Sequence, residues 1–116
     1  MKSHVRRAIA YIAGRVISGN PSSSIYDYGT SQYTSMSGSV DESHVSVYDY
    51  DKSCHISGSL SSLYHYGESQ HVSLKLDGTK FSGYDYGTSS HFSGTVNGKS
   101  VSLYDYSCSS YFNYSI

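Results

Sequence analysis

The chain has 116 residues, of which 14 are tyrosine and none is tryptophan. A formal net charge of −1 excludes the strong positive field that most nucleic-acid-binding proteins present, so we expect no nucleic-acid partner. No stretch approaches the ~20 apolar residues of a membrane-spanning helix. We therefore expect a single domain over residues 1–116 and no integral membrane segment.

Residues 3–18 are predicted to form an amphipathic helix that ends before Gly19 and Pro21. The apolar stripe consists of Val5, Ile9, Ile12 and Val16. Two roles fit this basic segment. It can cover the apolar face of a sheet, which is the role we favour, or it can act as a targeting helix.

Residues 22–116 contain five copies of a short signature, which are Tyr26-Asp27-Tyr28, Tyr48-Asp49-Tyr50, Tyr64-His65-Tyr66, Tyr84-Asp85-Tyr86 and Tyr104-Asp105-Tyr106. Apolar and polar residues alternate on both sides of each copy, which is typical of a strand with one buried face. Repeats of about 20 residues indicate one supersecondary unit stacked on copies of itself. We therefore predict five β-hairpins that form an open, twisted antiparallel meander of ten strands.

The turn residues predict the register of these hairpins. Asn97-Gly98 favours a two-residue type I′ turn, which would place Phe92 opposite Leu103. Gly67-Glu68 and Gly87-Thr88 favour type II′ links between hairpins, and only the first link, after Gly29, is expected to be longer. In this register the rows of side chains run straight across the sheet.

Two rows then lie on the face that is predicted to be buried. An apolar row consists of Ile25, Met36, Val47, Ile56, Leu63, Val72, Gly83, Phe92, Leu103 and Phe112. An acidic row, Asp27, Asp49, His65, Asp85 and Asp105, lies on the same face near one end. Its carboxylates are expected either to face water at the sheet margin or to pair with Arg6, Arg7 or Arg15 of the helix.

The opposite face carries the tyrosines and three histidines, which are the candidate ligand-binding residues. They are Tyr48, Tyr50, Tyr64, Tyr66, Tyr84, Tyr86, Tyr104, Tyr106, His55, His71 and His91. Tyrosine joins an apolar ring to a polar tip, and it is common at binding surfaces. The alternative is that these rings serve only strand propensity and cross-strand packing.

Ser, His and Asp recur once per hairpin in equivalent surroundings, whereas a catalytic triad needs one distinguished base and one orienting group. We therefore expect no enzymatic activity and no cofactor. His55, His71 and His91 lie on alternate strands with backbones ~9–10 Å apart, too far to converge on one metal ion. The predicted function is a β-repeat scaffold or protein-interaction module, and the alternative is a carbohydrate-binding module that uses the tyrosine face.

Two further expectations concern partners and compartment. An open sheet of ten strands is ~45 Å wide, so one short helix would leave Phe92, Leu103 and Phe112 in water and favour a homodimer. Cys54 and Cys108 would lie more than ~20 Å apart, beyond disulfide reach. Free thiols indicate a reducing compartment, which predicts a cytoplasmic protein.

The hairpin rhythm resembles that of choline-binding repeats and of the Tyr-Asp repeats in large bacterial toxin shells. The first family relies on tryptophan, which this chain lacks. The second carries Gly-Arg after Tyr-Asp, which none of the five copies does. The resemblance is limited to the hairpin rhythm and implies no site residues.

Overall fold

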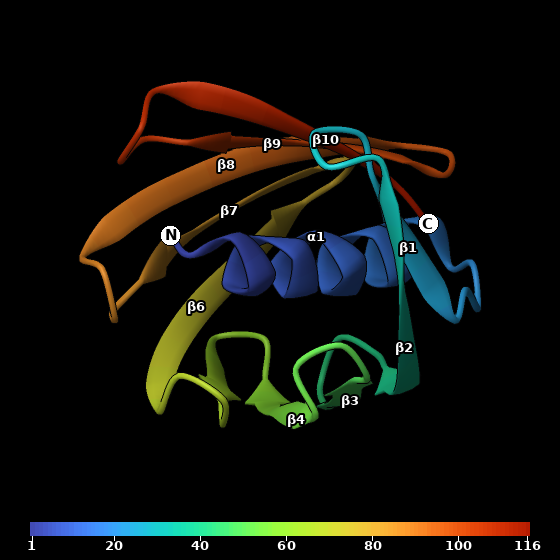
Figure 1. Ribbon diagram of the computed structural model, residues 1–116, viewed down its shortest axis with the longest axis horizontal. Helices are drawn as coiled ribbons and strands as arrows, with labels where there is room; N and C mark the ends of the chain where they lie inside the picture. Colours follow the sequence, from blue (N-terminus) through green and yellow to red (C-terminus); the bar gives the residue numbers. More distant parts are fainter.

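The computed structural model describes residues 1–116 and shows ten antiparallel strands wrapped around one helix (Figure 1). The elements are α1 (Ser3–Ser18), β1 (Ser24–Asp27), β2 (Gln32–Val40), β3 (Val45–Asp49), β4 (Cys54–Ser59), β5 (Ser62–His65), β6 (Gln70–Asp77), β7 (Lys80–Asp85), β8 (Ser90–Asn97), β9 (Ser100–Asp105) and β10 (Ser110–Ser115). The predicted helix and the predicted number of strands are confirmed. α1 is neither long nor apolar enough to cross a bilayer.

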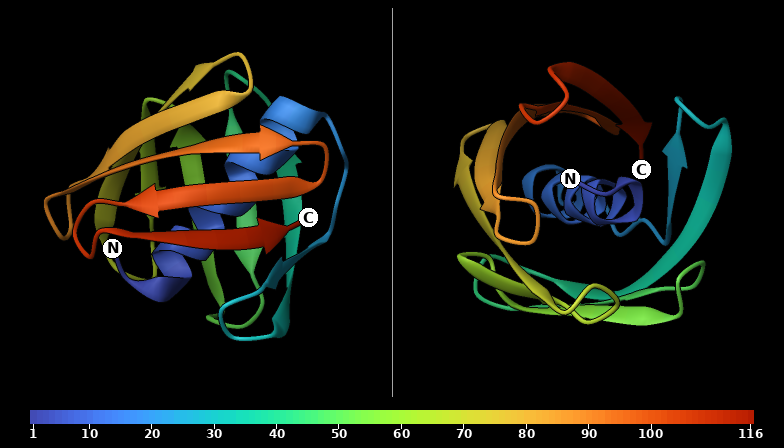
Figure 2. Two further views of the ribbon diagram at one scale, coloured as in Figure 1. Left: turned by 90° about the horizontal axis from the view of Figure 1, so that it is seen from above. Right: turned by 60° about the vertical axis from the view of Figure 1, so that its left-hand side comes forward.

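The sheet closes into a barrel, so the prediction of an open meander is wrong. β10 returns to β1, where Tyr26 lies opposite Ser115 and Asp27 opposite Tyr114. Each other strand pairs with its neighbours in the chain. A view along the barrel shows α1 running through its interior (Figure 2).

Closure follows from a two-residue displacement at the hairpin turns. Gly98 and Lys99 form the turn after β8, and Phe92 consequently lies opposite Asp105 rather than Leu103. The predicted type I′ turn is wrong, because positive φ occurs at Gly98 and not at Asn97. The same displacement places Met36 opposite Asp49, Ile56 opposite His65 and Val72 opposite Asp85. All four displacements have the same sense, and they supply the stagger that a closed barrel requires.

A displacement of two residues leaves every side chain on its predicted face, because side chains alternate with a period of two. The links between hairpins have the predicted register, which is seen in the pairs Tyr48–His55, Tyr64–His71 and Tyr84–His91. The predicted type II′ turns are wrong, because positive φ occurs at Ser69 and Ser89 and not at Gly67 or Gly87. The first link is an exception to the prediction. It is no longer than the others, because Asp27 pairs with Gln32 just as Asp85 pairs with Ser90.

α1 is buried on all sides and not only along the predicted stripe. The completely enclosed residues are Val5, Ala8, Ile9, Ala10, Tyr11, Ile12 and Ala13, none more than 1% exposed. Small side chains let the barrel approach the helix. At Gly14, an added Cβ would lie 2.9 Å from Val101 and 3.0 Å from Ile116. The helix therefore covers the aliphatic face of the sheet, as predicted, but does so from inside a closed barrel.

This arrangement removes the reason for expecting a homodimer. Phe92 and Leu103 are 1% and 0% exposed, so the apolar patch predicted for an open sheet does not exist. Phe112 is partly buried, and the Arg6 guanidinium lies 3.5 Å from the centre of its ring. Any self-association must therefore use the outer surface of the barrel.

Candidate binding surface

The signature builds a turn at one end of the barrel. The Asp of the signature points inward at the end of its strand, and one carboxylate oxygen accepts the backbone N–H two residues later. The acceptor and donor pairs are Asp27 with Gly29, Asp49 with Asp51, Asp85 with Gly87, and Asp105 with Ser107, at 2.8–3.0 Å. In the third copy, Nδ1 of His65 accepts the Glu68 N–H at 3.2 Å. The signature residue is therefore a turn former as well as an inward-facing side chain.

Each of these turns ends with a serine in the left-handed region of backbone space. These residues are Ser31, Ser53, Ser69, Ser89 and Ser109, with φ between 50° and 55°. The second tyrosine of each signature begins the turn and donates its N–H to a carbonyl of an adjacent strand, at 3.0–3.2 Å. The acceptors are Asn113 for Tyr28, Ser35 for Tyr50, His55 for Tyr66, His71 for Tyr86 and His91 for Tyr106. The backbone of each exposed tyrosine is therefore fixed.

The rings outside the barrel gather into five aromatic clusters, one per signature. A cluster contains both signature tyrosines and one aromatic residue from the next strand. The clusters are Tyr26/Tyr28/Tyr33, Tyr48/Tyr50/His55, Tyr64/Tyr66/His71, Tyr84/Tyr86/His91 and Tyr104/Tyr106/Tyr111. The first tyrosine touches both other rings, with centroids 4.6–4.9 Å apart and interplanar angles of 59–80°. Such edge-to-face contacts hold the rings in defined orientations.

The aromatic clusters expose a large ring surface. Seven of the tyrosines are 55–76% exposed, and they are Tyr28, Tyr33, Tyr50, Tyr66, Tyr86, Tyr106 and Tyr111. Two of the signature hydroxyls reach serines on the adjacent strand, Tyr50 to Ser37 at 3.0 Å and Tyr106 to Ser93 at 3.4 Å. The surface is therefore an array of fixed rings beside hydroxyl groups.

All eleven predicted site residues lie in these clusters, but the structure separates them into different clusters and does not bring them to one point. Sequence reasoning left Tyr26, Tyr28, Tyr33 and Tyr111 out of the site. A signal for them was present, because an aromatic residue follows the first signature tyrosine at the same spacing in every copy. The assumption of a longer first link concealed Tyr33.

The acidic row lies inside the barrel, around the N-terminal half of α1. Arg7 donates to Asp49 at 2.8 Å, and Arg6 donates to Asp105 at 3.2 Å. Both carboxylates are completely buried. For these two residues, pairing with the helix is confirmed and the alternative of a solvated margin is wrong. Arg15 instead donates to the backbone carbonyl of Gly38 and to the Tyr11 hydroxyl.

Two other acidic-row residues have neutral partners. Asp85 is 0% exposed and accepts hydrogen bonds from Gln70 and from the Thr88 hydroxyl. Asp27 has its turn contact with Gly29 but no ion pair within 4 Å. All four carboxylates therefore form turns, and only Asp49 and Asp105 also balance charges of the helix.

Two groups at this end of the barrel, Asp105 and Tyr114, have shifted pKa values. Burial opposes ionisation of Asp105, but hydrogen bonds from Ser107 and the chain's N-terminal ammonium at 3.3 Å leave its pKa lowered. Burial raises the pKa of Tyr114 to about 12, and its hydroxyl has no hydrogen-bond partner. These shifts arise from enclosure next to the helix and not from a site open to a ligand.

A second group of polar residues surrounds His65. Burial, with a smaller contribution from His4, lowers the pKa of His65, whose Nε2 has no partner. Hydrogen bonds from Lys2 and His4 lower the pKa of Glu68. The neighbouring Cys54 is buried, and burial and Asp49 raise the pKa of its thiol. Cys54 is therefore a weak nucleophile.

Both cysteines are free, as predicted, with Cys108 exposed.

Comparison of the chain with protein-family models, with curated proteins and with solved structures gives no match. The aromatic clusters are consequently the feature of this chain that bears on its function.

Proposed function

We propose that this protein is a non-enzymatic interaction module that binds protein surfaces, including a second copy of itself, through the aromatic clusters. The observation that carries the proposal is the fixed exposure of the tyrosines. The signature tyrosine Tyr50, for example, is 55% exposed while its backbone N–H and its ring are both held in place. Rigid, exposed aromatic rings contribute contact area with little loss of conformational entropy on binding.

The position of α1 supports an outer binding surface. The helix occupies the barrel interior, where Ile9, Ile12 and Ala13 are at most 1% exposed. Contacts with partners therefore fall on the outside of the barrel. Five similar clusters around one barrel also allow several weak contacts to act together, which raises the overall affinity.

Sedimentation velocity at micromolar concentration tests self-association. The wild-type chain should sediment above its monomer mass, and the triple variant Tyr50→Ser/Tyr66→Ser/Tyr86→Ser should return to the monomer. Lys99→Ser, an exposed change at the opposite end of the barrel, is the matched control and should sediment like the wild type. A wild-type monomer at every concentration would overturn self-association.

A carbohydrate ligand is the second candidate function. It is favoured by the serine hydroxyls beside the tyrosine rings, such as those of Ser37 and Ser93, since sugars offer both apolar C–H faces and hydroxyl groups. The reducing, cytoplasmic location inferred from the two cysteines stays a prediction.

A further inference from the structure

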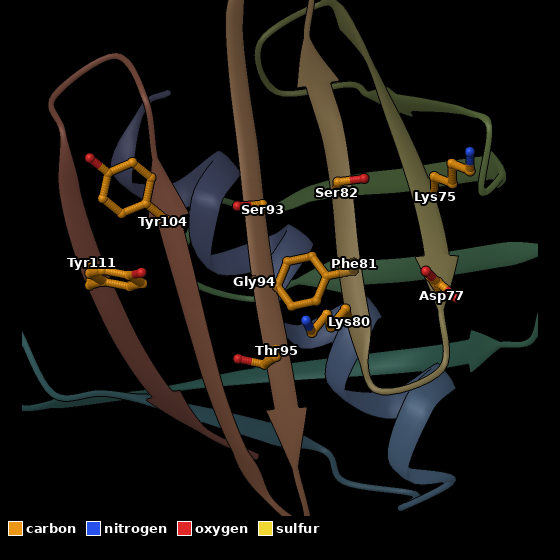
Figure 3. Close-up of a pocket in the computed structure, with 10 residues that line it drawn as sticks. All are labelled: Lys75, Asp77, Lys80, Phe81, Ser82, Ser93, Gly94, Thr95, Tyr104 and Tyr111. Carbon is orange, nitrogen blue, oxygen red and sulfur yellow. The ribbon is translucent and has the colours of Figure 1, made fainter.

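A groove of about 470 Å³ crosses the outer surface of β6 to β10 (Figure 3). Its lining residues are Lys75, Asp77, Lys80, Phe81, Ser82, Ser93, Gly94, Thr95, Tyr104 and Tyr111. Five strands at ~4.8 Å spacing make this surface ~19 Å wide. The groove is therefore large enough for several linked sugar rings and too open to enclose a small apolar molecule.

Tyr104 and Tyr111 lie at one side of the groove, on β9 and β10 (Figure 3). Their ring centroids are 4.7 Å apart and the rings meet at 65°. Tyr111 is 68% exposed, so much of its ring surface is open to a ligand. An aromatic face of this kind packs against the C–H face of a pyranose ring.

Hydroxyl groups lie between the tyrosines and the far side of the groove. Ser82 and Ser93 are cross-strand partners, and Thr95 is two residues further along β8. Of these three side chains, only that of Ser93 has a hydrogen bond within the protein, to Tyr106 at 3.4 Å. A hydroxyl both donates and accepts, as the hydroxyls of a sugar do. The middle of the groove therefore suits a ligand rich in hydroxyl groups.

The far side of the groove carries an excess of positive charge. Lys75 and Asp77 lie on β6, and Lys80 lies at the start of β7. None of these three exposed side chains is in an ion pair. Lys75 is the cross-strand partner of Ser82, and Lys80 is that of Thr95 on β8 and of Asp77 on β6. Each ammonium group therefore lies on a strand next to a hydroxyl, and two cations face one anion.

We propose that this groove binds an acidic oligosaccharide, a chain of uronic acid residues whose carboxylates pair with Lys75 and Lys80. The sugar rings stack on Tyr104 and Tyr111, and their hydroxyls meet the serines between. Neither a neutral glycan nor an acidic peptide matches all three features, because the first leaves the lysines without partners and the second has no pyranose C–H face to stack on the tyrosine rings. This site rests on the second candidate function and does not depend on self-association.

Isothermal titration calorimetry with a panel of hexameric oligouronates tests the proposal. Neutral hexasaccharides and hexaglutamate serve as comparison ligands. At least one oligouronate should bind, and both comparison ligands should bind at least about tenfold more weakly. Binding should also weaken with added salt.

Three variants locate the site. Lys75→Gln/Lys80→Gln and, separately, Tyr111→Ser should each weaken oligouronate binding at least about tenfold. Lys52→Gln, which removes an exposed lysine from the loop between β3 and β4, should leave it unchanged. The lysine variants should not alter sedimentation, so failure of this site and failure of self-association are distinguishable.

Three results would overturn the proposal. The first is the absence of binding by every oligouronate in the panel. The second is equal affinity for a neutral hexasaccharide or for hexaglutamate, which would reduce the site to ring stacking or to charge alone. The third is full binding by the double lysine variant.

Discussion

The most informative perturbation is Asp49→Asn, because it removes a buried charge while retaining a turn acceptor. Asp49 is 0% exposed, accepts Arg7 at 2.8 Å and accepts the Asp51 N–H at 2.9 Å. The asparagine oxygen can still accept the turn N–H, but Arg7, whose side chain is only 12% exposed, loses its buried carboxylate partner. Loss of one partner of a buried pair costs about 3–5 kcal/mol. We expect the low end, about 3 kcal/mol, because Asp51 remains 3.4 Å from Arg7.

Asp27→Asn is the matched control, since Asp27 holds the equivalent turn without an ion pair. It should cost no more than about 1 kcal/mol, the contribution of a typical hydrogen bond. Urea unfolding followed by far-ultraviolet circular dichroism measures both free energies of unfolding. Arg7→Met should recover part of the loss in the Asp49→Asn background, because the unpaired cation is then removed. Equal costs for the two Asp→Asn variants, or no recovery in the double variant, would refute the role of the ion pair.

Three further predictions concern stability. Ile12→Asp places a charge in the filled interior and should abolish cooperative thermal unfolding, whereas Ser39→Asp on the exposed face should leave the melting temperature within a few degrees. Ser89→Gly should stabilise the fold by about 0.5 kcal/mol, since Ser89 has φ +53°, while Thr88→Gly should destabilise it in the same urea assay. The lowered pKa of His65 means that the unfolded chain binds a proton more readily, so stability should fall as pH drops below about 6.5. The melting temperature of His65→Gln should fall less over that range than the melting temperature of the wild type. An equal fall in both proteins would contradict the inference.

The faces of the strands were predictable and the closure of the sheet was not. Alternation assigns Leu103 to the inside and Tyr104 to the outside in any register displaced by two residues. The displacement itself depends on which residue takes positive φ in the turn. The pair Asn97-Gly98 predicted a type I′ turn with Asn97 as its first central residue. In the structure, Gly98 is the first central residue of the turn and Lys99 is the second. Local turn preferences differ by about 1 kcal/mol or less, so the packing of the whole barrel decides among them.

The residue types of the candidate surface were predicted from the sequence, but their division into five separate aromatic clusters was not. The tyrosine–histidine pairs across the links followed from the link register, which was correct. The first cluster was missed, and the last was predicted without Tyr111, because Tyr33 and Tyr111 replace the histidine there. The serines with positive φ were also missed. Serine rarely adopts this conformation, and only its recurrence at one place in all five turns indicates it.

The number of strands and the composition of α1 depend on each other. About eight strands enclose a space that side chains alone can fill, and a ten-stranded barrel is wider. Part of the inner space is filled by the sheet itself, because Gly83 and Gly94 make room for the rings of Phe92 and Phe81. A helix with small side chains outside its predicted apolar stripe, such as Ala10 and Ala13, fits that space and is buried on all sides. The closed barrel is therefore the arrangement that covers both the apolar row of the sheet and every side of the helix, whereas an open sheet would leave part of each in water.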